Sequence, residues 1–309
     1  MPNKTLWQEH CWQNVAQGPM SYQFWELGEV NGAGHDPEDH TSGSAAAVIA
    51  LHGWLDNSAS FTPMLEHLLS QSDLTRVNVY ALDFAGHGHS FHRPQGCFYT
   101  IWDYAIDVVQ FIQAKELHEV WLLGHSMGAC VAPLIAAMLP AKVQGICAIE
   151  GLGPVTTVAS ETPRQLQKAI VRQGQQQQRA SKVFATAEDA LLARLGSKMT
   201  LQEPAARLLV GRNLLAKEGG FVWRSDRRVT LPSPVRYSED QIWAVLDGLS
   251  MPVTLVVGDA LQQDVGLSKR AKRIPHIQWR RLSGGHHLHM ENQVSACADA
   301  IIELLTINS

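Results

Sequence analysis

A serine stands between two glycines in the stretch LLGHSMGAC, residues 122–130, where Gly124, Ser126 and Gly128 spell G-x-S-x-G. An unassisted hydroxyl is a weak nucleophile, but a neighbouring histidine can take its proton and activate it for attack on a carbonyl. A chain with 24 glycines among 309 residues produces this pattern about 0.1 times by chance. Whether Ser126 is a nucleophile therefore has to be judged from the strands, helices and other motifs around it.

Histidines that could serve as the base are numerous, with 14 in the chain. The segment SGGHHLHME, residues 283–291, contains three of them. We expect His286 to be the base, because it follows a glycine pair just past the last strand-like run. His287 and His289 are the local alternatives. A zinc site built from these histidines lacks a partner cluster elsewhere in the sequence, so no metal is expected.

Short apolar runs precede each of these motifs. Continuous apolar runs of this length, as opposed to alternating ones, are typical of parallel strands that are buried on both faces. The runs are residues 46–52, 77–83, 119–124, 143–150, 252–258 and, more weakly, 276–282.

Helical patterns separate these runs. The pattern over 100–117 has apolar residues at three- and four-residue spacing and Thr100 as its expected N-cap; two others cover 127–140 and 291–307. The alternation of strands and helices predicts an α/β fold with a doubly wound, mostly parallel sheet. No cofactor-binding motif accompanies it, so no cofactor is expected.

The region from about 155 to 240 differs, because it contains no strand-like run and is polar and mostly helical in pattern. We interpret the four glutamines 175–178 as a solvated helix face in preference to a disordered linker. The sequence thus predicts a core of residues 1–154 and 241–309, with a helical cap over 155–240 inserted between strands. Such an insertion is expected to act as a lid over the carboxyl edge of the sheet, where α/β folds bind ligands.

The order of the motifs resembles that of the α/β-hydrolase fold superfamily, and more narrowly its serine hydrolase-like proteins. LHGWLDNSASF resembles the family's oxyanion loop, ALDFAGHGHS its D-x-x-G-H-G-x-S turn, GHSMG its nucleophile elbow and GGHHLHME its terminal histidine segment. The motifs span residues 46–291, and FVWRSDRR resembles the end of the family's cap. The resemblance implies that Ser126 is the nucleophile and His286 the base, with His289 structural.

The acid of the triad departs from the common family pattern, in which Asp stands three residues after the glycine that ends the strand behind the lid. Leu261 occupies that place. Some branches of the superfamily carry the acid at the end of the preceding strand, where this chain has Glu150. A carboxylate that follows an apolar run is costly unless it is paired, and a histidine would pair it. Glu150 is therefore the expected acid, with Asp259 as the alternative and Asp264 as a third candidate.

The remaining site residues are assigned from the same resemblance. The backbone N–H groups of Met127 and Trp54 are expected to form the oxyanion hole. The substrate pocket is expected to include His52, Gly53, Phe84 and His125, with His52 as a hydrogen bonder and not a reactive group. Asp56 and Asp83 are interpreted as structural.

The function that follows is hydrolysis of a small ester or thioester with an apolar acyl group, through an acyl-enzyme. The same constellation also serves carbon–carbon bond hydrolases, lyases and perhydrolases, and a ligand-binding relative with a weak triad is a further alternative. A basic residue in the pocket would indicate a carboxylated substrate. Arg224 and Arg227 are candidates for that role, although surface or hinge pairing is the preferred interpretation of both.

Composition excludes other classes of function. A net charge of −4 gives no basic face for nucleic acid or anionic lipid. No run of about 18 apolar residues predicts a membrane span, and the first residues lack the apolar core of a signal peptide. Five scattered cysteines favour reduced thiols in a cytoplasmic protein. The sequence does not indicate an oligomeric state.

Overall fold

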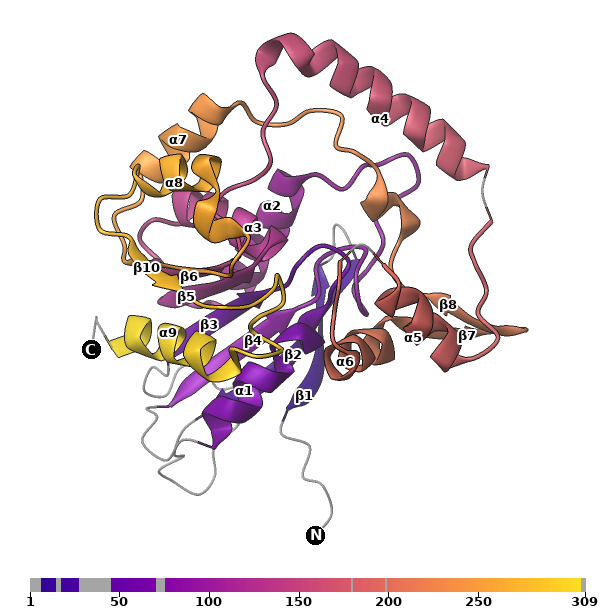
Figure 1. Ribbon diagram of the computed structural model, residues 1–309, viewed down its shortest axis with the longest axis horizontal. Helices are drawn as coiled ribbons and strands as arrows, with labels where there is room; N and C mark the ends of the chain where they lie inside the picture. The colour runs from indigo at the N-terminus through magenta and orange to yellow at the C-terminus, as the bar shows by residue number, and fades with distance from the viewer. Residues whose placement is uncertain are drawn as a thin grey trace.

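An eight-stranded sheet forms the centre of the computed structural model, which describes residues 7–14, 18–27, 46–70, 76–178, 180–197 and 199–306 (Figure 1). Its strand order is β1-β2-β4-β3-β5-β6-β9-β10. The strands are β1 (Gln8–Asn14), β2 (Gly18–Leu27), β3 (Ala46–Leu51), β4 (Val77–Leu82), β5 (Val120–His125), β6 (Val143–Ile149), β9 (Val253–Val257) and β10 (Gln278–Arg281). All pairs from β4 to β10 are parallel, which confirms the predicted α/β fold with a mostly parallel sheet.

Helices cover both faces of the sheet, which explains why its central strands read as unbroken apolar runs. Residues of α1 and α9 pack in one core cluster, and residues of α2, α3, α7 and α8 pack in the other. Within the described residues, no helix has both the length and the apolar content needed to cross a bilayer. The helices are α1 (Thr62–Leu69), α2 (Ile101–Ala114), α3 (Met127–Met138), α4 (Thr162–Gln177), α5 (Ala187–Leu195), α6 (Glu203–Asn213), α7 (Glu239–Asp247), α8 (Val265–Ala271) and α9 (Val294–Thr306).

The sheet is larger than the sequence predicted, because β1 and β2 add two antiparallel strands at one edge. β1 has the sequence QEHCWQN and lies at the sheet edge. None of its residues 8–13 is buried, and most of them are polar. β2 is mostly buried, but Ser21 and Gln23 interrupt its run of apolar residues. A search for continuous apolar runs therefore misses both strands.

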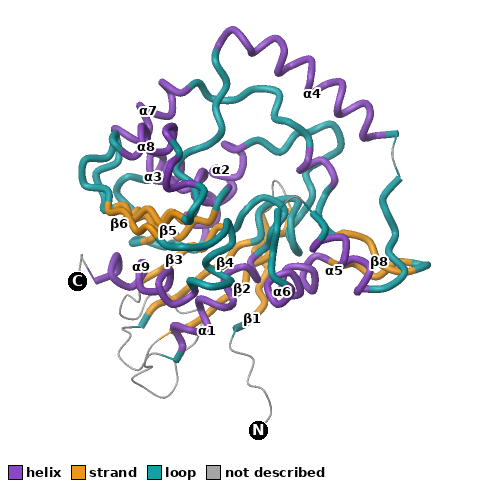
Figure 2. Tube along the Cα trace, in the orientation of Figure 1, coloured by secondary structure: helices purple, strands orange, loops and turns teal. Residues whose placement is uncertain are grey.

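The segment between β6 and β9 carries α4, α5 and α6 and stands beside the sheet (Figures 1 and 2). Glutamines 175–177 lie in α4, as predicted for a solvated helix face. The expectation that this region contains no strand is wrong: β7 (Leu214–Lys217) and β8 (Gly220–Trp223) pair as an antiparallel hairpin. A two-residue loop that ends in Gly219, with φ of 83°, makes the tight turn possible.

Candidate active site

Ser126 occupies the sharp turn between β5 and α3, with φ of 50° and ψ of −106°. A Cβ atom on Gly128 would lie 1.8 Å from the carbonyl oxygen of Leu51, and one on Gly124 would lie 2.6 Å from the backbone of Ala129. Only glycine fits at either place, so the G-x-S-x-G spacing follows from the close approach of α3 to the sheet. The turn holds the serine in the left-handed region, which non-glycine residues rarely adopt.

A continuous set of hydrogen bonds joins Ser126, His286 and Glu150. Nε2 of His286 lies 2.9 Å from Oγ of Ser126, and Nδ1 of the same ring lies 3.0 Å from Oε2 of Glu150. The imidazole side chain is 36% exposed, whereas the Glu150 side chain is 2% exposed. The structure thus brings together the serine, histidine and glutamate that the sequence singled out.

Glu150 owes its position to the end of β6, where it adopts a φ of 58°. Its backbone N–H bonds the carbonyl of Val256 at 2.8 Å, and its Oε1 accepts a hydrogen bond from the N–H of Gly258. Both partners belong to the β9 end, so the neighbouring parallel strand fixes the carboxylate. Its second oxygen is left for the imidazole.

The two alternative acids lie elsewhere. Oδ2 of Asp259 accepts a hydrogen bond from the N–H of Gly284 at 3.0 Å, and Oδ1 of Asp264 accepts one from the N–H of Leu267 as the N-cap of α8. Among the described residues, the carboxylate that contacts the His286 ring is that of Glu150.

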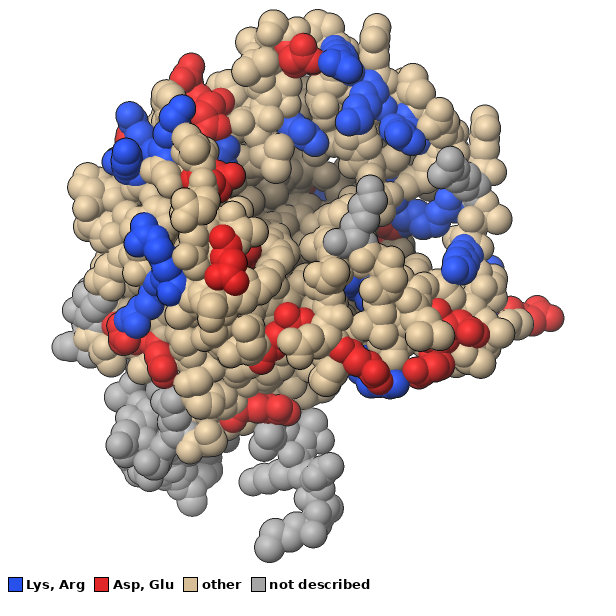
Figure 3. All heavy atoms as spheres, in the orientation of Figure 1, with Lys and Arg blue, Asp and Glu red and all other residues tan. Residues whose placement is uncertain are grey.

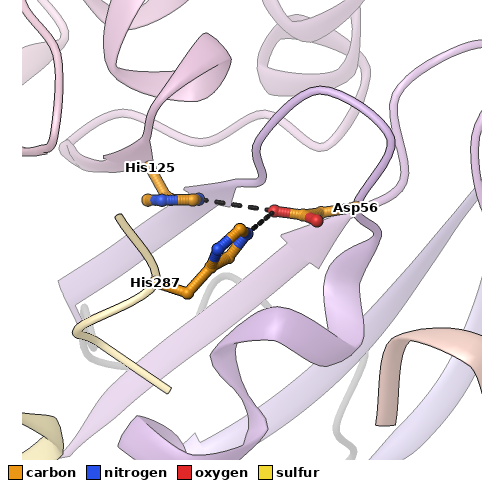
Figure 4. A group of neighbouring side chains, drawn as sticks. All are labelled: Asp56, His125 and His287. Carbon is orange, nitrogen blue, oxygen red and sulfur yellow. Dashed lines mark hydrogen bonds and ion pairs between the residues drawn. The ribbon is translucent and has the colours of Figure 1, made fainter. Parts of the chain in front are cut away.

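A second group of titratable residues is buried behind His286: Asp56, His125 and His287 (Figure 4). Nε2 of His287 lies 3.1 Å from Oδ2 of Asp56, and Nδ1 of His125 lies 3.6 Å from the same oxygen. On its other side, His125 donates from Nε2 to the carbonyl oxygen of His286 at 2.9 Å. The group therefore supports the backbone of the residue that contacts the serine.

Burial and charge set the protonation of this group. Burial alone would raise the pKa of the Asp56 carboxyl, but the imidazoles of His125 and His287 hold that pKa well below its usual range. Burial lowers the pKa of His125 to about 4 and that of His289 well below its ordinary value. His125 and His289 are therefore neutral near pH 7, and Asp56 is ionised.

Asp56, His125 and His287 also offer one ligand atom each within 4.8 Å of one another, which is a possible three-ligand metal set. It differs from the histidine run at residues 286–289, because only His287 belongs to both. Arg194 lies 3.6 Å from Oδ1 of Asp56 and already balances the carboxylate charge.

His52 and Asp83 hold the loops at the sheet edge. Nδ1 of His52 donates to the carbonyl of Gly53 at 2.7 Å, and Nε2 accepts from the N–H of Phe84 at 3.0 Å. Asp83 is buried and bound by the guanidinium of Arg212 at 2.7 Å. Both residues thus act as hydrogen bonders away from the serine.

A cavity of about 820 Å³ opens above Ser126. Trp54, Met127 and Glu150 contribute to its wall, with residues of α4 and of the 229–237 segment opposite. The four residues expected to line the pocket do not belong to this wall, because their side chains or backbone turn into the core beneath it: His52, Gly53, Phe84 and His125. Phe84, for example, is fully buried.

Two residues of the cavity wall, Met127 and Trp54, have backbone N–H groups without an acceptor in the described structure. Met127 is the first residue of α3, so its N–H has no acceptor within the helix. The backbone N–H of Trp54 likewise has no acceptor among the described residues, whereas its indole N–H donates to the carbonyl of Val229 at 2.8 Å.

Several residues of the cavity wall were missed from the sequence. Lys168, Arg172 and Arg236 belong to the wall, whereas Arg224 and Arg227 do not. Their positions depend on how α4 folds back over the site, which no local motif encodes. Cys130 also reaches the wall, but burial raises the pKa of its thiol to about 12, so it is not a competing nucleophile.

Comparisons with known proteins identify the family of the chain. The family model described as alpha/beta hydrolase fold matches residues 46–293. A serine hydrolase-like protein of Danio rerio is 31% identical over 257 residues, which cover 79% of this chain and 77% of the relative.

Two solved structures resemble the chain in fold. A hypothetical protein from Pseudomonas aeruginosa PAO1 is 32% identical, with a TM-score of 0.82 over 97% of this chain and 99% of that one. The thioesterase domain from the curacin biosynthetic pathway shares the fold, with a TM-score of 0.74 at 21% identity over 96% of this chain and 99% of that one. The chain belongs to the α/β hydrolase fold family.

Proposed function

We propose that this protein is a serine hydrolase of small esters or thioesters, in which Ser126 is the nucleophile, His286 the general base and Glu150 the acid. The observation that carries the proposal is the continuous hydrogen bonding from the serine hydroxyl through the imidazole to a buried carboxylate, at 2.9 Å and 3.0 Å. This is the arrangement that an activated nucleophile requires. The name of the Danio rerio relative, serine hydrolase-like protein, supports the same class.

The reaction divides into acylation and deacylation. His286 takes the proton of Ser126 as Oγ bonds to the substrate carbonyl carbon, and the imidazolium then gives that proton to the leaving alcohol or thiol. A water molecule next gives a proton to His286 as its oxygen bonds to the acyl carbon. The imidazolium returns that proton to Oγ as the bond between Oγ and the acyl carbon breaks, which releases the carboxylic acid and restores the serine. Glu150 orients the imidazole and stabilises its positive charge in both halves.

The oxyanion that forms in each half is proposed to rest on the backbone N–H groups of Met127 and Trp54. Two fixed donors without other acceptors stabilise developing charge more than they stabilise a neutral carbonyl. Residues 155–240 form the proposed cap, since α4 and the 229–237 segment supply the wall opposite the serine. An apolar acyl group fits the part of the wall made by Trp54, Ile101 and Tyr104.

The experiment that tests this proposal is labelling with a fluorophosphonate, combined with hydrolysis of p-nitrophenyl esters of several acyl lengths. The wild-type protein is expected to label and to turn over the esters, Ser126→Ala to do neither, and the surface variant Ser250→Ala to match the wild type. Labelling that persists in Ser126→Ala would move the nucleophile elsewhere. A folded wild-type protein that neither labels nor turns over would favour a ligand-binding relative.

A further inference from the structure

Positive charge gathers on the cap side of the cavity. Lys168 and Arg172 come from α4 and Arg236 from the 229–237 segment, and all three belong to the cavity wall. Figure 3 shows the hollowed face of the molecule with Lys and Arg side chains over α4 at its upper rim. The chain as a whole carries a net charge of −4, so this is a local concentration of charge against the overall balance.

Two hydrogen bonds anchor α4 on the segment that completes the cavity wall. Gln165 donates to the carbonyl of Ser233 near one end of the helix, and Gln176 donates to the carbonyl of Arg227 near the other. Residues spaced by three or four positions share one face of a helix, so Lys168 and Arg172 lie on the anchored face between the two glutamines. Both residues belong to the cavity wall and are also exposed to solvent.

These three cations have no acidic partner within the described part of the chain. Arg164 on the same helix does have one, since it pairs with Glu161 at 3.5 Å. The carboxylate of the cavity wall is that of Glu150, which His286 and the N–H of Gly258 already bind.

Like charges one helical turn apart repel, and an anion placed between them relieves that repulsion. A cavity lined by one sign of charge also concentrates ligands of the opposite sign. Trp54, Ile101 and Tyr104 add apolar surface to the cavity wall from the core, and Val229, Leu231 and Val235 add apolar surface from the cap. The cavity wall therefore combines apolar surface from the core and the cap with three cations from the cap, which form its cationic end.

We infer that the cationic end is a subsite for an anionic group of the substrate, formed by Lys168, Arg172 and Arg236. The substrate is then an ester or thioester whose carbonyl lies at Ser126 and whose remote end carries a carboxylate or phosphate. This inference rests on the proposed function, because it assumes that the acyl group is transferred at Ser126. It assigns to cap residues a role in choosing the substrate, and none in the chemistry.

Matched substrate pairs test the inference and separate the two sources of negative charge. For a carboxylate, the p-nitrophenyl monoester of glutaric acid is compared with p-nitrophenyl valerate, which has the same number of acyl carbons. For a phosphate, valeryl-coenzyme A is compared with valeryl-pantetheine. The measured quantity is the ratio of kcat/KM for the anionic substrate to kcat/KM for the neutral one.

The ratio is expected to exceed about tenfold in at least one pair and to fall in 0.5 M NaCl, since exposed charges are screened. Lys168→Gln, Arg172→Gln and Arg236→Gln are each expected to lower it by about two- to fivefold, the range of partly exposed ion pairs. Arg164→Gln, on the same helix but outside the cavity wall, is the matched control and should leave the ratio unchanged. The pair that shows the preference identifies the anion.

A kcat/KM ratio near one in both substrate pairs would overturn the inference, and so would a ratio that the three substitutions leave unchanged. Hydrolysis of the neutral esters would still support the proposed function in either case. Absence of all turnover would instead contradict the proposed function. In that case, calorimetric titration of Ser126→Ala with valeryl-coenzyme A and valeryl-pantetheine still tests whether the subsite binds an anion, because it measures the affinity for each compound. Equal affinity for the two compounds, together with equal affinity for glutarate and valerate, would overturn it.

Discussion

His125 donates a hydrogen bond from Nε2 to the backbone carbonyl of His286 over 2.9 Å, and the two rings lie 5.0 Å apart. His125 is also the last residue of β5 and directly precedes Ser126. The strand that carries the proposed nucleophile therefore also holds the loop that carries the proposed base. Asp56, on the loop after β3, lies on the other side of the His125 ring, with its Oδ2 3.6 Å from Nδ1.

His125 is predicted to act as a positioning residue. His125→Phe keeps a ring but removes the donor, which frees the His286 backbone; a displacement of about 1 Å costs on the order of a hundredfold in rate. We expect kcat to fall by about 10- to 100-fold with KM within about twofold. His125→Gln, whose amide can donate, should recover part of the loss. Steady-state kinetics and the rate of fluorophosphonate labelling of the two variants measure the loss and its recovery. A kcat of His125→Phe equal to that of wild type would contradict the role.

Glu150, and not Asp259, is predicted to be the triad acid. Glu150→Gln keeps the shape of the side chain but removes the charge that stabilises the imidazolium, so kcat is expected to fall by about 10²- to 10⁴-fold. Asp259→Asn should stay within about threefold of wild type, because that carboxylate bonds only the N–H of Gly284 among the described residues. Ester hydrolysis by both variants at pH 8 measures this, and the opposite ranking would transfer the role to Asp259.

Much of the fold was predictable because the buried parallel strands leave a strong pattern. The runs at 46–52 and 143–150 became β3 and β6 with ends within one residue. The edge strand β1 was missed because its residues 8–13 are exposed or only partly buried, which permits polar side chains. The β7–β8 hairpin did carry a signal, since Gly219 and Gly220 stand where the turn lies, but an expectation of helix outweighed it.

The site, like the fold, was predictable only in part. Ser126, His286 and Glu150 each follow a strand end, and the carboxyl ends of parallel strands meet at one edge, so their proximity could be predicted. The cavity wall could not, because it depends on which way side chains turn after those strands and on where α4 docks. Phe84 turns into the core, whereas Lys168, which is 84 positions further along the chain, reaches the cavity.

The free energy of unfolding is predicted to decrease between about pH 6.5 and pH 4. Burial lowers the pKa of His87 to about 3 and that of His125 to about 4, while an unfolded chain titrates its histidines near pH 6.5. The unfolded state binds more protons in this window, so stability falls as pH falls. Urea unfolding at pH 8, 6 and 5 measures the slope, which a pH-independent free energy would contradict.

His87 allows a direct test of this explanation, because it is buried and does not belong to the cavity wall, and its removal deletes one histidine with a lowered pKa. His87→Leu is expected to destabilise the protein at pH 8, but by about 2 kcal/mol less at pH 5, where the wild type suffers the cost of keeping His87 neutral and the variant does not. An equal loss at both pH values would show that His87 does not contribute to the acid sensitivity.

Two glycine-to-alanine substitutions in helices are predicted to have opposite effects on stability. In Gly128→Ala the new methyl group would lie 1.8 Å from the carbonyl oxygen of Leu51, so α3 has to shift from the sheet, at a cost of about 3 kcal/mol or more. In Gly174→Ala, on α4, the methyl group meets no atom within 4 Å, and reduced freedom of the unfolded chain should add about 0.5–1 kcal/mol. Urea unfolding of both variants measures the difference. Equal stability of Gly128→Ala and wild type would mean that α3 does not need its close contact with β3, and that this contact does not explain the second glycine of G-x-S-x-G.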